Sequence, residues 1–110
     1  MSERYAGKPF LELLDAYVLD AIGHLEPGRS AALTVREAEF RRMFGGTGDW
    51  RTQVVQRMQF PDGMAGAIRE LWEKGAAKFV AAQGYQPDPA EFVRARSWIR
   101  TSRIEARNLR

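Results

Sequence analysis

The chain has 110 residues, which suits one compact domain and leaves no room for a second domain of ordinary size. Hydrophobic residues make up 45% and charged residues 28%, a composition that is typical of globular proteins and excludes wholesale disorder. No apolar run approaches the roughly 20 residues that cross a bilayer, and the absence of cysteine excludes disulfides, zinc fingers and a cysteine nucleophile.

An unusually apolar segment, residues 9–25, is predicted to form the first helix. Pro9 suits the first helical turn, where its missing N–H costs nothing, and apolar residues then recur at three- and four-residue steps as far as Leu25. A helix this apolar is usually covered on several sides. We therefore expect it at the centre of the core, with a seam between two copies of the chain as the alternative. Glu26-Pro27-Gly28 is predicted to end it.

Two shorter helices are expected to follow. The second helix begins either at Ser30 or at the capping box Thr34-Val35-Arg36-Glu37, in which the hydroxyl and the glutamate each bind a free backbone N–H. The glycine-rich stretch 45–48 ends it. Asp49 is the expected cap of the third helix, and Phe60 marks its end because the residue before a proline avoids the helical conformation.

The fourth predicted helix spans residues 64–83 and ends at Gly84, and we expect it to pack along the first. The segment Asp88-Pro89-Ala90-Glu91 predicts the start of a fifth helix, because Asp88 can cap it, Pro89 suits its first position and Glu91 is an acid in its first turn. This helix is expected to run toward Arg110. Strand signals are poor throughout. The sequence therefore predicts an all-α fold: a single helical domain over residues 1–110, a small bundle of four to five helices whose C-terminal helix is amphipathic and arginine-rich.

Positive charge is concentrated at the end of the chain. Residues 94–110 hold six arginines and one glutamate (+5), whereas residues 1–93 hold 11 basic and 13 acidic side chains (−2). Five of these arginines step by four, three, four and three residues, so on one continuous helix they share an arc of about 80°. This predicted arginine stripe consists of Arg96, Arg100, Arg103, Arg107 and Arg110.

Three interpretations of the arginine stripe stay open. It is a set of phosphate contacts of a nucleic-acid-binding protein, since a guanidinium donates two parallel bonds to phosphate. It is the cationic face of a helix that binds an anionic membrane or an acidic protein. Or residues 97–110 form a solvated, projecting or frayed helix whose arginines pair with the acidic body of the domain.

Two further features are candidates for binding. Trp98 and Ile99 lie beside the stripe, where an exposed tryptophan would anchor an interface and a buried one would pack the core. Residues 34–60 allow a helix-turn-helix, although the connection is longer than the usual turn and a solvated polar face explains the same residues. Its second helix would present Arg51, Gln53, Gln56, Arg57 and Gln59.

Residues that would carry catalysis are not found together. His24 is the only histidine, and Glu12 and Asp15 are expected on the wet strip of the first helix. The glycines at 45–48 lack the lysine of a phosphate loop. We therefore predict no catalytic residue, no metal site and no cofactor.

The sequence favours a small non-enzymatic domain that acts through protein–protein interaction, either with a protein partner or by self-association. The alternative is a nucleic-acid-binding protein that uses the arginine stripe. Because the first residues lack an apolar signal segment, the expected location is the cytoplasm, without a transmembrane segment.

Overall fold

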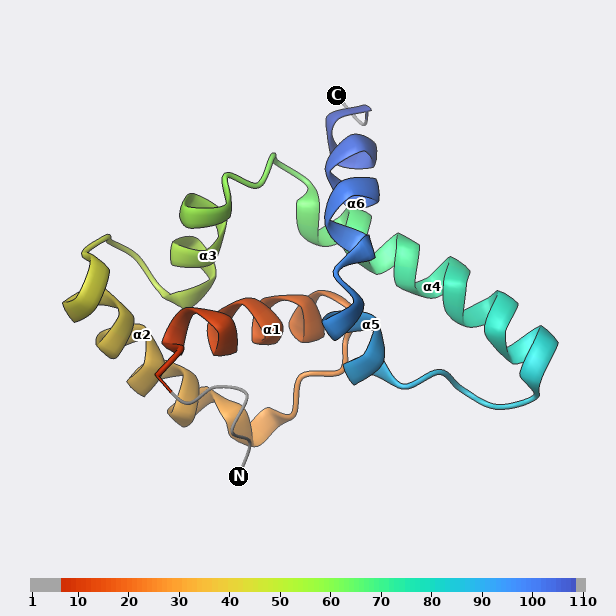
Figure 1. Cartoon of the computed structure of the whole chain (residues 1–110), viewed down its shortest axis with the longest axis horizontal. Coiled ribbons are helices and arrows are strands. Elements are labelled where there is room, and N and C mark those ends of the chain that lie inside the picture. The colour runs from red at the N-terminus through yellow and green to blue at the C-terminus, as the bar shows by residue number, and fades with distance from the viewer. Residues whose placement is uncertain (1–6, 109–110) are drawn as a thin grey trace. The chain divides into compact units, whose positions relative to one another are not determined.

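The computed structural model describes residues 7–108, apart from the side chains of Ser30 and Asn108. Within this part of the chain all regular secondary structure is helical, which confirms the all-α prediction (Figure 1). The elements are α1 (Pro9–Ala21), the short 3-10 turn η2 (Pro27–Arg29), α2 (Ser30–Phe44), α3 (Trp50–Met58), α4 (Met64–Gln83), α5 (Pro89–Ala95) and α6 (Ser97–Asn108).

The helices divide between two compact units. Unit 1 comprises the chain up to Tyr17 and Leu25–Gln59, and unit 2 comprises Val18–His24 and the chain from Phe60 onward. Unit 1 thus holds the first part of α1 with η2, α2 and α3, and unit 2 holds the end of α1 with α4, α5 and α6. The single domain expected over residues 1–110, and the packing of the fourth helix along the first, stay predictions.

Helix α1 is apolar and buried, as predicted, but it ends earlier than expected. Gly23 adopts the left-handed conformation (φ 80°), and the N–H of His24 donates to the carbonyl of Leu19 at 2.8 Å. This is a Schellman cap, in which a glycine without Cβ closes the helix and leaves Leu25 outside it. The buried hydrophobic residues of the segment are Leu13, Leu14, Ala16, Tyr17, Val18 and Ile22.

The expectation that Glu12 and Asp15 lie on a wet strip is wrong. Asp15 is only 2% exposed, and the carboxylate of Glu12 is bound by Arg29 at 3.4 Å and by Arg36 at 3.1 Å. Arg36 also forms an ion pair with Glu39. The carboxylates of Glu39 and Glu12 together raise the pKa of Arg36, and the hydrogen bond with Glu39 has the largest effect. Within unit 1, Glu12 thus ties α1 to η2 and α2.

Helix α2 begins at Ser30, the first of the two starts that the sequence left open, and not at the capping box. The turn η2 runs directly into the helix, so Thr34 lies inside it and cannot cap it. Glu37, which the capping box would direct backwards, instead pairs with Arg41 one turn ahead at 3.4 Å.

The junction between α2 and α3 is held by Gly48 and Asp49. The Gly48 carbonyl accepts from Arg41 at 2.9 Å and from the buried amide of Gln53 at 3.1 Å. Gly48 has φ +85°, and a Cβ there would lie 2.8 Å from Cγ2 of Thr52, so only glycine suits this position. The carboxylate of Asp49 caps α3, as predicted, by accepting from the N–H of Thr52 at 2.9 Å.

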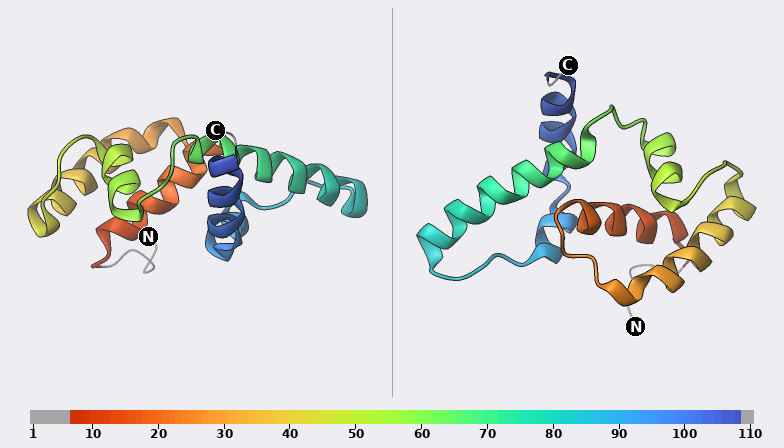
Figure 2. Two further views of the ribbon diagram at one scale, coloured as in Figure 1. Left: turned by 90° about the horizontal axis from the view of Figure 1, so that it is seen from above. Right: turned by 180° about the vertical axis from the view of Figure 1, so that it is seen from behind.

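In unit 2, α4 spans the predicted residues and ends at Gly84 in the left-handed conformation (φ 81°). Asp88 caps α5 by accepting from the N–H of Ala90 at 3.0 Å, which confirms the predicted start. Helix α6 lies against the first part of α4 (Figure 2). The residues of α6 that become buried are Trp98, Ser102 and Ala106, which recur at four-residue steps on one side of the helix.

The predicted last helix is two helices. Arg96 adopts the left-handed conformation (φ 63°), and this residue separates α5 from α6. The prediction of four to five helices is therefore low by at least one within residues 7–108. The cause is a local conformation that non-glycine residues adopt rarely and that no glycine, asparagine or proline announces in the sequence.

The cap of α3 gives a test with a defined pH dependence. Hydrogen bonds from Thr52 lower the pKa of Asp49, so the unfolded chain holds the proton more tightly than the folded chain. The stabilisation by the ionised Asp49 cap is present above the pKa of about 3.9 in the unfolded chain, and it is lost as the pH falls through the lower pKa of the folded chain. We expect Asp49→Ala to lower the free energy of unfolding by about 1 kcal/mol near neutral pH.

Urea unfolding of the wild type, Asp49→Ala and Asp49→Asn between acidic and neutral pH measures this effect. Asparagine can still cap but does not titrate, so Asp49→Asn is expected to keep much of the stability and to lose part of its pH dependence. Equal stability of Asp49→Ala and the wild type near neutral pH would refute the role of the cap.

Candidate interaction site

The break at Arg96 removes this residue from the arginine stripe. Arg96 is half-buried at the end of α5, and the helical phase that would align it with the next arginines is lost. Arg110 lies outside the described residues. The described part of α6 therefore carries three of the five predicted arginines, namely Arg100, Arg103 and Arg107.

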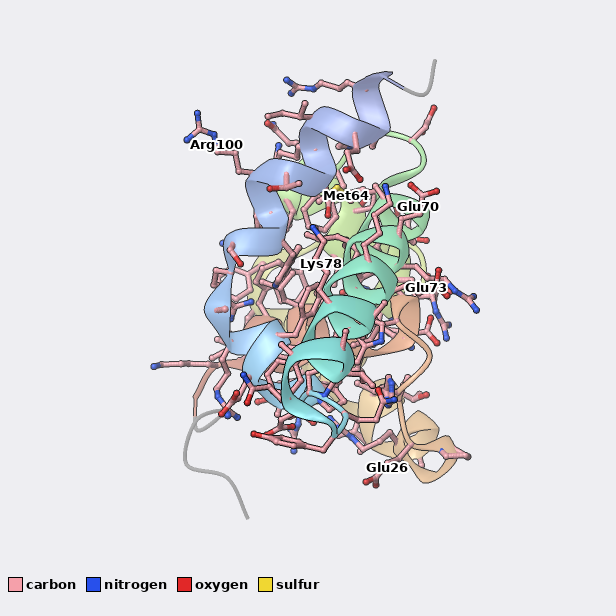
Figure 3. All side chains as sticks on the ribbon, turned by 90° about the vertical axis from the view of Figure 1, so that its right-hand side faces the viewer. Glu26, Met64, Glu70, Glu73, Lys78 and Arg100 are labelled. Atoms are coloured by element: carbon pink, nitrogen blue, oxygen red, sulfur yellow. The ribbon has the colours of Figure 1, made fainter. Side chains whose placement is uncertain are left out.

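These three arginines differ in their surroundings. Arg103 is half-buried, and its guanidinium carbon lies 5.5 Å from the centroid of the Phe60 ring. Arg100 and Arg107 are exposed, and Arg100 extends away from α4 into solvent (Figure 3). Because one arginine covers an aromatic ring, the exposed cationic surface of α6 is smaller than the sequence predicted.

Trp98 lies in the core of unit 2. Its side chain is 0% exposed, its indole N–H donates to the carbonyl of Val93 at 3.1 Å, and its ring meets Phe60 edge-on at 6.3 Å. A ring buried in this way packs the core and presents no surface to a partner. Ile99, the other candidate interface residue, is half-buried.

Sequence reasoning missed Ile104, which is 51% exposed on α6. It lies four residues after Arg100 and three before Arg107, so these arginines flank it on the same side of the helix. The signal was present in the sequence, because an isoleucine among the stripe arginines belongs to the outward face and not to the apolar sector.

An apolar groove of about 300 Å³ lies in unit 2 between α4 and the segment that leads into α5. Trp72 and Phe92, which both line it, form an edge-to-face pair, and the lining residue Phe79 pairs in the same way with the exposed Tyr85 outside the lining; ring centroids are 5.3 Å apart in each pair. Its lining residues are Leu71, Trp72, Gly75, Ala76, Phe79, Pro87, Asp88, Glu91 and Phe92.

The groove is open beside Gly75 and acidic on one side. A Cβ added to Gly75 would meet no atom within 4 Å, so the α4 side has room for an incoming side chain. Asp88 and Glu91 are exposed on the α5 side. Apolar surface beside exposed carboxylates suits an apolar side chain that is flanked by a cation.

The structure removes one residue from the row of polar residues that a helix-turn-helix would use. Gln53 is 2% exposed and donates to the Gly48 carbonyl, so it is not available to a base edge. Arg51 stacks on Trp50 at 4.3 Å, and Arg57 lies over phenyl rings of unit 1. Of the five residues only Gln53 is buried, whereas Arg51, Gln56, Arg57 and Gln59 are exposed, so the helix-turn-helix stays a prediction.

Within residues 7–108 no three histidine or acidic side chains are grouped so that they could hold a metal ion. None of the helices described here is long and apolar enough to cross a membrane.

No protein-family model matches the chain, and searches of curated proteins and of solved structures likewise find no match.

The burial of Trp98 predicts a structural effect for Trp98→Phe. The smaller ring loses the hydrogen bond to Val93 and leaves space in the core of unit 2, so we expect a loss of about 1–3 kcal/mol in the free energy of unfolding. Chemical unfolding at one fixed protein concentration measures it. Unchanged stability would show that the ring does not pack this core.

Proposed function

We propose that the chain is a non-enzymatic protein-interaction domain that associates with a second copy of itself. In this association α6 of one copy lies in the apolar groove of unit 2 of the other copy. The proposal is supported by the match between two surfaces of the same chain: an exposed apolar residue flanked by cations, and an apolar groove flanked by carboxylates.

The apolar part of the match is Ile104 against the centre of the groove. Ile104 is the one large hydrophobic side chain that is exposed on the described part of α6, and a branched aliphatic side chain suits the open space above Gly75. Aromatic rings of Trp72, Phe79 and Phe92 would then surround it. Removing such a side chain from water in an aromatic pocket is the usual source of affinity in small interfaces.

The charged part of the match fixes the orientation. Arg100 and Arg107 flank Ile104, and Asp88 and Glu91 flank the groove on its α5 side. Lys74 and Lys78, adjacent in sequence to the α4 lining, are exposed and would repel the arginines. The arginines of the second copy are therefore expected on the α5 side, where pairing with carboxylates speeds and directs association.

The self-association test uses sedimentation velocity over a range of concentrations. We expect the wild type to associate, and we expect Ile104→Glu and Gly75→Leu each to raise the dissociation constant at least about tenfold. Gly66→Leu is the matched control, because Gly66 is an exposed glycine of α4 with open space around its Cβ but does not line the groove. It should associate like the wild type.

A charge exchange provides a second arm of the test. Glu91→Arg should weaken association, and combining it with Arg100→Glu should restore it in part, because the pair is then present with reversed signs. Asp88 is left unchanged because it caps α5.

A wild type that remains monomeric at every concentration would overturn the proposal, as would equal effects of Gly75→Leu and Gly66→Leu.

Nucleic-acid binding is the alternative function. Salt-sensitive binding of labelled duplex DNA by the monomer, lost in Arg100→Glu with Arg107→Glu, would put that function in place of self-association.

A further inference from the structure

A pocket of about 270 Å³ lies within unit 1, at the end of α2 and along α3, and the proposed self-association does not use it. It combines an aromatic surface, a guanidinium, amide side chains and two glycines. Its lining residues are Phe40, Phe44, Gly45, Gly46, Gln53, Gln56 and Arg57.

Arg57 supplies a cation that lies against three aromatic rings. Its guanidinium carbon lies 4.7 Å from the Phe44 centroid, 5.5 Å from that of Phe10 and 5.6 Å from that of Phe40. No carboxylate among residues 7–108 forms an ion pair with it. A guanidinium that contacts rings and forms no ion pair keeps N–H donors for a ligand, and a carboxylate can accept two parallel bonds from them.

Gln53 supplies a buried acceptor. The side chain is 2% exposed, and its Nε2 donates to the Gly48 carbonyl at 3.1 Å. Its Oε1 is buried and accepts no hydrogen bond in the structure. A buried amide oxygen without a donor is unfavourable, and because Gln53 lines the pocket, a ligand N–H or O–H that reaches this oxygen would remove the penalty.

The remaining lining gives a flat apolar surface with room beside it. Phe44 is 52% exposed, unusually high for a phenylalanine, so part of its ring is accessible to a ligand. Gly45 (φ 75°) and Gly46 (φ 102°) have no atom within 4 Å of an added Cβ, so the loop leaves space next to this ring. An aromatic ligand ring stacked or edge-on against Phe44 suits this space.

From these groups together we propose that the pocket binds a small aromatic carboxylate that carries an N–H or O–H donor. The carboxylate would accept from the edge of Arg57, the ring would lie against Phe44, and the donor would bind Oε1 of Gln53. The volume lies near the lower limit of about 300 Å³ for small-molecule pockets, so a ligand of one or two rings is expected.

The test follows amide resonances of the ¹⁵N-labelled full chain while indole-3-acetate is added, with indole-3-acetamide as the neutral analogue. The two probes share the ring and its N–H and differ in charge. We expect shifts at the backbone amides of Gly45 and Gly46 and at the side-chain amide of Gln53. Binding of the neutral analogue should be weaker by at least about tenfold, since it lacks the charge that pairs with Arg57.

Arg57→Gln should reduce binding of indole-3-acetate by a similar factor. Arg51→Gln is the matched control, because Arg51 also stacks on an aromatic ring of α3 but does not line the pocket. Arg51→Gln should bind like the wild type. Equal binding of the two probes by the wild type, which needs no variant, would overturn the proposal, and so would an absence of shifts at the named amides.

Discussion

The left-handed turn at Arg96 determines which side chains of the last helix face solvent. It ends α5 and starts α6 in a new direction, so that Trp98, Ser102 and Ala106 pack in unit 2. The same rotation leaves Ile104 and its flanking arginines outward. A continuous helix would have placed all the arginines on one ridge, and the apolar groove beside α5 would have had different neighbours.

Arginine acts in this chain mainly through rings and carboxylates of its own units. In unit 1, Arg29 and Arg36 bind Glu12 and Arg57 covers phenyl rings; in unit 2, Arg103 lies over Phe60. Guanidinium groups suit such places because they are planar and weakly hydrated. The number of arginines therefore overstates the cationic groups that are left for a partner, although the net charge of +3 is unchanged by these contacts.

Sequence patterns located most helix ends correctly where a backbone-specific residue marks them, as at Asp49, Gly84 and Asp88. They failed where the deciding event is tertiary or conformational. Asp15 looks polar and solvated in a helical wheel but is buried, and Arg96 carries no local signal for its left-handed conformation. The candidate surfaces were harder still, because the groove and the Arg57 pocket combine residues from separate helices and loops, whereas the outward position of Ile104 could be recognised from its spacing among the arginines.

The most direct test of this account compares Arg96→Gly with Arg96→Ala by urea unfolding. Both variants remove the same side-chain contacts, so their difference reports the backbone conformation alone. A left-handed residue 96 predicts that Arg96→Gly is more stable than Arg96→Ala by about 1 kcal/mol, because glycine adopts this conformation without a Cβ clash. The opposite order, with alanine more stable by about 1 kcal/mol, is the behaviour of a helix interior and would contradict the break between α5 and α6.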